Sequence, residues 1–236
     1  MHTAIVTGGT KGIGYGIAKA LLAVGGKVMI TGRDAAGVAK AVAKLESTSA
    51  PGASVRGRAV DVRDRAAVDS LIAEAVSEFG SLNTLVNNAG VGHFTPVEQM
   101  TDDNWARVID TNLTGVFYCS RAAIPMIRSA GGGWIINIAS LAGRNYFANA
   151  AAYCASKAGL VAFSEALMLE VRHENIRVSV VMPGSVATDF NHPTDRPADE
   201  SWKLTPDDIA EVVMDLLRHP SRSLPSKVEI RPARTK

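Results

Sequence analysis

Short runs of β-branched and apolar residues alternate along the chain with longer stretches in which apolar residues recur at helical spacing. Seven runs predict strands: Thr3–Thr7, Lys27–Thr31, Val55–Val60, Thr84–Asn87, Trp134–Ala139, Arg177–Met182 and Lys227–Ile230. Several runs lack in-and-out alternation, which is typical of strands covered on both faces. The alternation of strands and helices predicts βαβ units and a mostly parallel sheet with helices on both faces.

The clearest helix is predicted over residues 64–79. Its apolar positions, among them Val68, Leu71 and Ile72, repeat at helical spacing. Asp64 is a candidate N-cap, and Gly80 follows the expected end. We expect one face of this helix to pack on the sheet.

Length and charge limit the class of protein. The chain has 236 residues, 47% of them apolar, and a formal net charge of +2. Such a chain can bury roughly 70 to 75% of its unfolded surface in one domain, and no linker, repeat or low-complexity tract divides residues 1–236. Lysine and arginine form no block that would indicate a nucleic-acid or membrane partner. We therefore expect a single domain whose partners are small molecules.

The amino-terminal residues enter a strand-like run directly, without the basic and apolar segments of a secretion signal. The two cysteines, Cys119 and Cys154, form no Cys-x-x-Cys pair, which suits a reducing compartment. These features predict a cytoplasmic protein.

A glycine-rich turn follows the first predicted strand. Gly8, Gly12 and Gly14 form the pattern T-G-x-x-x-G-x-G, and a helix is expected to begin near Ile13. Such a turn brings backbone N–H groups close to a phosphate because no Cβ atom blocks the approach. The pattern matches neither the G-x-G-x-x-G fingerprint nor the P-loop. Since glycine turns are also common in ordinary structure, this one indicates a phosphate site only together with other motifs.

Further motifs follow in a defined order. Residues 87–90 read N-N-A-G after the fourth predicted strand, Ser140 ends the fifth, and Tyr153 and Lys157 stand one helical turn apart on a shared face. Together with the glycine turn, this set resembles the short-chain dehydrogenase/reductase family over about residues 7–217. The resemblance implies a single-domain doubly wound (Rossmann) α/β fold that binds a nicotinamide cofactor.

The resemblance also implies a catalytic set made of Asn112, Ser140, Tyr153 and Lys157. Hydride reduction of a carbonyl leaves an alkoxide that needs a proton donor, and Tyr153 suits this acid/base role. A free phenol has a pKa of about 10, so the Lys157 cation is expected to favour the phenolate. By resemblance Lys157 also holds the nicotinamide ribose, Ser140 binds the substrate oxygen, and Asn112 supports a water that passes protons to Lys157.

The cofactor site extends over several loops. The resemblance and the residue chemistry together place there Gly8, Thr10, Lys11, Gly12, Ile13, Gly14, Arg33, Asp61, Val62, Asn88, Ala89, Gly90, Tyr153, Lys157, Pro183, Gly184, Val186 and Thr188. Asp61 is expected to hydrogen-bond the adenine.

The residues at the end of the second predicted strand indicate a preference for NADP(H) over NAD(H). Gly32 occupies the place where NAD-preferring relatives usually carry an acid, and Arg33 has planar donors that fit a phosphate. By resemblance Lys11 faces the same 2′-phosphate. Asp34 is the counter-indication, because an acid at this distance from the glycine turn can bind the ribose of NAD. Asp34 also precedes a helical run over residues 35–45, so a helix N-cap is the alternative explanation.

The substrate pocket is expected beyond the carboxyl ends of the strands. An apolar or aromatic lining is predicted from His93, Phe94, Tyr146, Phe147, Phe190 and Trp202, with a substrate loop at about residues 184–204. Arg144 is either a handle for an acidic group or an exposed loop arginine, and we favour the second.

The predicted function is NADP(H)-dependent reduction of a ketone or aldehyde to an alcohol, running reversibly. A 3-oxoacyl thioester reductase of the same family and a catalytically silent dinucleotide-binding sensor remain open. Ser140 lies outside any G-x-S-x-G elbow, which argues against a hydrolase. The histidines show no ligand spacing, so no metal site is expected.

The segment 149–171 is apolar or small on more than one helical face, which predicts burial against another copy as well as on the sheet. By resemblance the helices containing Phe117 and Tyr153 would form a homodimer, or a homotetramer with a second contact. Residues 223–236 lack the glycine-rich finish of many relatives, which weakens the case for that second contact.

Overall fold

A computed structural model describes residues 2–191 and 200–234. Seven parallel strands form one sheet in the order β3-β2-β1-β4-β5-β6-β7. Their bounds are β1 (Thr3–Val6), β2 (Lys27–Gly32), β3 (Ser54–Ala59), β4 (Thr84–Asn87), β5 (Gly133–Ile138), β6 (Ile176–Pro183) and β7 (Lys227–Ile230). The seven predicted strands are thus confirmed. The chain order reverses between β1 and β4, which is where doubly wound sheets bind ligands.

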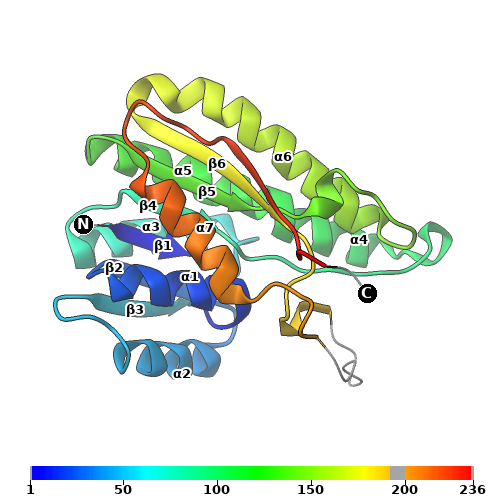
Figure 1. Ribbon diagram of the computed structural model, residues 1–236, viewed down its shortest axis with the longest axis horizontal. Coiled ribbons are helices and arrows are strands. Elements are labelled where there is room, and N and C mark those ends of the chain that lie inside the picture. Colours follow the sequence, from blue (N-terminus) through cyan, green and yellow to red (C-terminus); the bar gives the residue numbers. More distant parts are fainter. Residues whose placement is uncertain (1, 192–199, 235–236) are drawn as a thin grey trace.

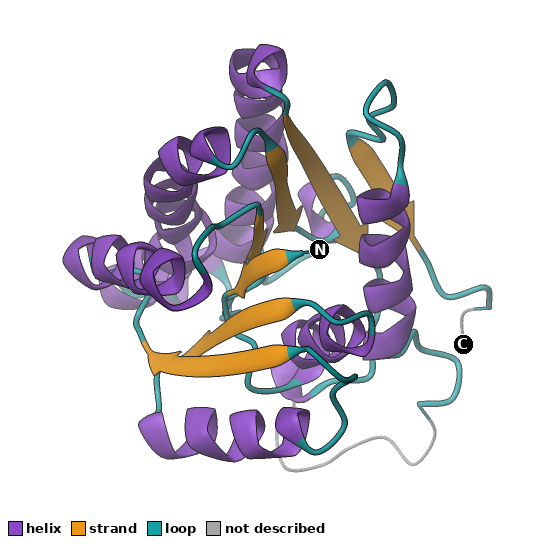
Figure 2. Cartoon of the chain, turned by 90° about the vertical axis from the view of Figure 1, so that its left-hand side faces the viewer, coloured by secondary structure: helices purple, strands orange, loops and turns teal. Residues whose placement is uncertain are grey.

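Helices cover both faces of this sheet (Figure 1 and Figure 2). Their bounds are α1 (Gly12–Ala23), α2 (Ala35–Glu46), α3 (Arg65–Phe79), α4 (Asp102–Ile109), α5 (Gly115–Ser129), α6 (Ala151–Val171) and α7 (Pro206–Arg218). One core layer packs α1, α2 and α7 on the sheet, and a second packs α3, α5 and α6 on the opposite face. The predicted Rossmann-like α/β architecture is confirmed. No helix in the described part of the chain is both long and apolar enough to cross a membrane.

Burial along the strands follows their position in the sheet. The central strands β1 and β4 are buried at every residue, whereas the edge strand β7 alternates between exposed and half-buried residues. Continuous apolar runs therefore belong to strands covered on both faces, as the sequence pattern predicts.

Side-chain caps begin several helices, α2 and α3 among them. The Asp34 carboxylate accepts a hydrogen bond from the Gly37 N–H at 2.7 Å, and Asp64 accepts one from Ala67 N–H at 3.1 Å. The predicted helix over 64–79 ends at Gly80, whose φ of +83° favours glycine. Both carboxylates thus satisfy N–H groups that a helix start leaves without intrahelical partners.

Candidate active site

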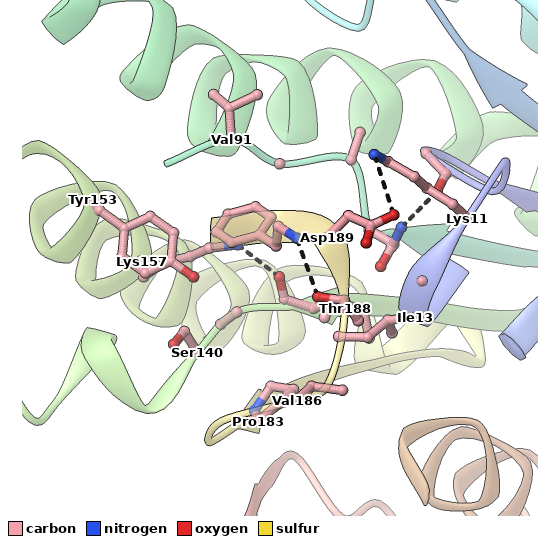
Figure 3. A pocket seen from close by; sticks show the side chains of 18 of the residues that line it. Lys11, Ile13, Val91, Ser140, Tyr153, Lys157, Pro183, Val186, Thr188 and Asp189 are labelled. Atoms are coloured by element: carbon pink, nitrogen blue, oxygen red, sulfur yellow. Dashed lines mark hydrogen bonds and ion pairs between the residues drawn. The ribbon is translucent and has the colours of Figure 1, made fainter. Parts of the chain in front are cut away.

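A cavity of about 940 Å³ opens at the carboxyl ends of the central strands. It runs from Arg33 and Asp34 after β2, past the turn between β1 and α1, to Tyr153 and Lys157 on α6. Figure 3 shows Lys11 and Ile13 toward one side of this space and Tyr153, Lys157 and Ser140 toward the other. The volume lies near the upper end of the usual range for ligand pockets, which suits a large ligand.

The glycine turn has the backbone that an anion site needs. Gly8 and Gly12 have φ values of +64° and +57°, a region that residues with a Cβ rarely adopt. The N-cap of α1 is Lys11, which makes no side-chain hydrogen bond to the helix, in contrast to the capped starts of α2 and α3. The first N–H groups of α1 therefore suit the pyrophosphate of a dinucleotide.

Gly14 serves packing rather than ligand contact. It is not among the described residues that line the cavity, although the sequence motif predicts it there. A Cβ at Gly14 would lie 2.5 Å from the Gly8 carbonyl oxygen and would also clash with the Asn88 side-chain amide. The third glycine lets α1 approach the turn, which is a packing role.

Hydrogen bonds fix the glycine turn to the loop after β4. The Thr7 hydroxyl accepts from the N–H groups of Asn88 and Ala89, both at 3.0 Å. The Asn88 amide donates to the Thr7 and Gly8 carbonyls at 2.9 and 3.1 Å. These bonds fix the glycine turn and the loop after β4 relative to each other. Asn88 therefore shapes the cofactor site as well as lining it.

Three of the four predicted catalytic residues line the far end of the cavity. Lys157 is only 4% exposed, its ammonium donates to the Ile138 carbonyl at 2.9 Å, and it lies 5.8 Å from the centre of the Tyr153 ring. Ser140 begins a short helix after β5, where its hydroxyl accepts from the Ala142 N–H at 3.1 Å. Tyr153, Lys157 and Ser140 thus face one space from two elements.

Burial shifts the pKa values of this group. It raises the pKa of Tyr153, while a hydrogen bond with Ser140 acts in the opposite direction. It also lowers the pKa of Lys157 to about 8. Desolvation of the phenolate thus outweighs the favourable contacts in this structure, and the expectation that the Lys157 cation favours the phenolate stays a prediction. A phenol that keeps its proton at neutral pH is suited to act as an acid.

Asn112 is not among the described residues that line the cavity, although it is bonded to Val91, which does line it. It is fully buried in a π-helical turn, Asp110–Thr114, between α4 and α5. Its amide nitrogen donates to the Val91 carbonyl at 2.9 Å and to the Ser156 hydroxyl at 3.0 Å, and its oxygen accepts from the Val91 N–H at 2.8 Å. Since these bonds occupy the side chain, any water passing protons to Lys157 would have to be held by the Asn112 backbone. The prediction that Asn112 supports a water that passes protons to Lys157 stays a prediction.

The remaining predicted cofactor residues do line the cavity. They come from the glycine turn, the ends of β2, β4 and β6, and the loop after β3: Gly8, Thr10, Lys11, Gly12, Ile13, Arg33, Asp61, Val62, Asn88, Ala89, Gly90, Pro183, Gly184, Val186 and Thr188.

The predicted substrate residues divide into two groups. Phe94, Phe147, Phe190 and Trp202 line the cavity, whereas His93 and Tyr146 are not among the described residues that do so. Tyr146 is 70% exposed. His93 and Tyr146 each directly precede a phenylalanine that does line the cavity. Of the predicted substrate loop, residues 192–199 lie outside the described residues.

Sequence reasoning missed Arg231 and Pro232 as lining residues. Lys203, which also lines the cavity, lies within the predicted substrate loop at about residues 184–204. Arg231 and Pro232 follow β7, so their position at the end of a parallel strand was the available signal. Arg144 forms an ion pair with Glu229 at 2.6 Å and is 61% exposed, as favoured for a loop arginine.

The chain was compared with known proteins. A family model described as short chain dehydrogenase matches residues 2–199. An uncharacterised oxidoreductase from Staphylococcus saprophyticus is 34% identical over 229 residues, covering 97% of this chain and 96% of that protein. The 3-oxoacyl-[acyl-carrier-protein] reductase of Chlamydia muridarum is 34% identical over 235 residues, with 95% and 93% covered.

A solved structure is similar over its whole length. A metagenomic short-chain oxidoreductase in complex with NADP has 34% identity and a TM-score of 0.85, with 99% of each chain covered. The protein described above therefore belongs to the short-chain dehydrogenase family. It is an oxidoreductase of that family.

Replacing Lys157 by Met should change how stability depends on pH. The folded pKa of about 8 lies below the ordinary value of 10.5. Between these values the unfolded chain holds a proton that the folded chain has lost, so the wild-type free energy of unfolding rises with pH. Between pH 7 and 9.5 we expect the wild type to gain about 2 kcal/mol relative to Lys157→Met, measured by urea unfolding.

The matched control is Lys40→Met, which removes an exposed ammonium on α2. This variant should follow the wild type at both pH values. An identical pH dependence for the wild type and Lys157→Met would contradict the described burial of the ammonium.

Proposed function

We propose that this protein is an NADP(H)-dependent reductase of ketones or aldehydes that also oxidises the corresponding alcohols. The observation that carries the proposal is the phenol of Tyr153 placed beside Ser140 and Lys157 at one end of a cavity large enough for a dinucleotide. When bound, the reduced nicotinamide supplies a hydride to the carbonyl carbon. Tyr153 gives its proton to the carbonyl oxygen, and the products are the alcohol and the oxidised cofactor.

Each neighbouring residue has a separate task. Ser140 holds the carbonyl oxygen next to the Tyr153 hydroxyl. The Lys157 ammonium binds the ribose hydroxyls and stabilises the tyrosinate left after proton transfer, an effect that a low local dielectric strengthens. Pro183, Gly184 and Thr188 line the cavity after β6 and would contact the nicotinamide.

The preference for NADP(H) rests on the end of β2. Asp34 already caps α2, so its carboxylate is engaged by the Gly37 N–H. A Cβ at Gly32 would lie 2.6 Å from the Thr10 methyl group, so the acid of NAD-preferring relatives would require Thr10 to move. Lys11 and Arg33 both line the cavity and supply two cations for the 2′-phosphate. The similar metagenomic oxidoreductase is in complex with NADP.

Two acidic side chains lie close to these cations. The Lys11 ammonium is 4.0 Å from the Asp189 carboxylate, and both side chains are more than half exposed, so this ion pair is weak enough to yield to a phosphate (Figure 3). Asp61 forms an ion pair with Arg63 at 2.6 Å, and hydrogen bonding from Arg63 is the largest influence lowering its pKa. Asp61 therefore stays an anionic acceptor, as adenine binding requires.

The 3-oxoacyl thioester reductase remains the second candidate, because the Chlamydia muridarum relative carries that name. A silent dinucleotide-binding sensor is disfavoured, because a pure binder has no need for an acid such as Tyr153 in the cavity.

We also propose that two copies associate through α5 and α6 in the cytoplasm. Phe117 on α5 is 40% exposed, and the Arg121 guanidinium lies 4.9 Å from the centre of its ring. An exposed aromatic ring with a neighbouring cation is therefore available for contact with a second copy. Both cysteines are free and buried, as in reducing compartments. Light scattering at micromolar concentration measures the association, and a monomer would contradict it.

Replacing Tyr153 by Phe removes one oxygen atom from the site. We expect turnover of ketones to fall by about three orders of magnitude or more because the proton donor is lost. NADPH binding, measured by calorimetry, should change by less than about threefold. Substantial turnover by the variant would show that another group is the acid.

Replacing Lys11 and Arg33 together by Ala should remove most of the cofactor preference. Loss of two charge-assisted contacts should lower the ratio of NADPH to NADH affinity by about 100-fold. The control pair Lys40→Ala and Arg65→Ala removes the same charges outside the cavity and should leave the ratio unchanged. Tighter binding of NADH than NADPH by the wild type would instead assign Asp34 to the ribose.

A further inference from the structure

Two phenylalanine rings flank the ring of Tyr153 and a third stacks on one of them, and we call Phe94, Phe147 and Phe190 the aromatic mouth. Phe94 lies 5.6 Å from the Tyr153 ring centre at 60°, and Phe190 lies 5.7 Å from it at 51°. Phe147 stacks on Phe94 at 6.0 Å and 25°. All three line the cavity and come from different loops, after β4, before α6 and after β6.

The rings of the aromatic mouth are open to solvent. Phe94 is 39% exposed, Phe147 52% and Phe190 41%. A single exposed apolar side chain is ordinary on a protein surface. Three adjoining phenyl rings around the group that gives up a proton form a contiguous apolar patch, and such patches are typical of binding sites. A ligand that covers these rings would remove their apolar surface from water.

The surrounding backbone is shaped to admit these rings. A Cβ at Gly92 would lie 2.7 Å from the Phe94 ring, so glycine lets this ring sit there, while the Phe190 ring lies at an ordinary contact distance of 3.4 Å. The N–H of Thr95 donates to the Asn149 carbonyl at 2.8 Å, which ties the loop of Phe94 to the loop before α6. The mouth is therefore held together by local packing and one backbone bond between loops.

The charges near the mouth argue against an acidic ligand. Among the described lining residues, the Lys203 ammonium is paired with Glu200 at 2.6 Å, and the Arg231 guanidinium with Glu229 at 2.8 Å. Glu229 is shared between Arg231 and Arg144, which leaves one positive charge in excess on two arginine side chains that are 52% and 61% exposed. Solvent weakens that charge, so it offers little to a carboxylate or an acidic carrier.

We propose that the aromatic mouth selects neutral ketones that carry an aromatic ring next to the reacting carbonyl. With the carbonyl oxygen at the Tyr153 hydroxyl, a ring attached to the carbonyl carbon falls among Phe94, Phe147 and Phe190. Aromatic rings gain from offset and edge contacts beyond the area they bury. This inference rests on the proposed function and narrows its substrate class.

The experiment compares kcat/KM with NADPH for acetophenone, butanone and acetoacetyl-coenzyme A. We expect acetophenone to exceed butanone by about tenfold or more, since the two differ in the group that meets the mouth. Phe94→Ala, Phe147→Ala and Phe190→Ala should each lower kcat/KM for acetophenone about tenfold and for butanone less than about threefold.

Tyr146→Ala is the matched control. Tyr146 adjoins Phe147 in the same loop but points to solvent, so this variant should keep kcat/KM for both ketones within about twofold of the wild type. Calorimetry should give the wild-type affinity for NADPH in all four variants. That result would show that each variant is folded with an intact cofactor site.

Three outcomes would overturn the inference. A higher kcat/KM for acetoacetyl-coenzyme A than for acetophenone would contradict it and leave the proposed function standing. Equal losses for acetophenone and butanone in the mouth variants would show that the rings support the site without selecting its substrate. Failure of the wild type to reduce any of the three probes would contradict the proposed function itself.

Discussion

Burial of the Lys157 ammonium beside the Tyr153 phenol is the constraint on which the site depends. Taking a lysine out of water moves its pKa to about 8, which corresponds to about 3 kcal/mol of cost for the charged form. The Ile138 carbonyl offsets part of this cost at 2.9 Å. The same desolvation keeps Tyr153 protonated. A site that holds an acid and a cation so close together requires rigid surroundings.

Those surroundings come from segments far apart in the sequence. Ser156 is fully buried, donates to the Tyr153 carbonyl at 2.8 Å and accepts from Asn112, which in turn binds the backbone of Val91. This chain of bonds fastens the first turns of α6 to the loop after β4. Thr7 and Asn88 fasten the same loop to the glycine turn. The cofactor side and the aromatic mouth therefore meet at Tyr153 because one loop is bound to both.

Sequence reasoning succeeded where local rules decide the structure. The strands, the caps at Asp34 and Asp64 and the shared face of Tyr153 and Lys157 depend on spacing within a few residues. Sequence reasoning does not reach features that neighbours distant in sequence decide. The burial that raises the pKa of Tyr153, the bonds of the Asn112 side chain to Val91 and Ser156, and the approach of Arg231 to the cavity all depend on such neighbours. His93 and Tyr146 were misplaced because loop side chains have no periodicity from which their direction can be predicted.

The most direct test of the account is to follow a labelled hydride. NADPH deuterated at both positions of nicotinamide C4 is incubated with the protein and acetophenone in ordinary water, and the product is examined by mass spectrometry and NMR. The account predicts 1-phenylethanol with one deuterium on the carbinol carbon, since that hydrogen comes from the cofactor and the hydroxyl proton comes from Tyr153 and ultimately from solvent. An alcohol without deuterium at that carbon, or no alcohol at all, would contradict it.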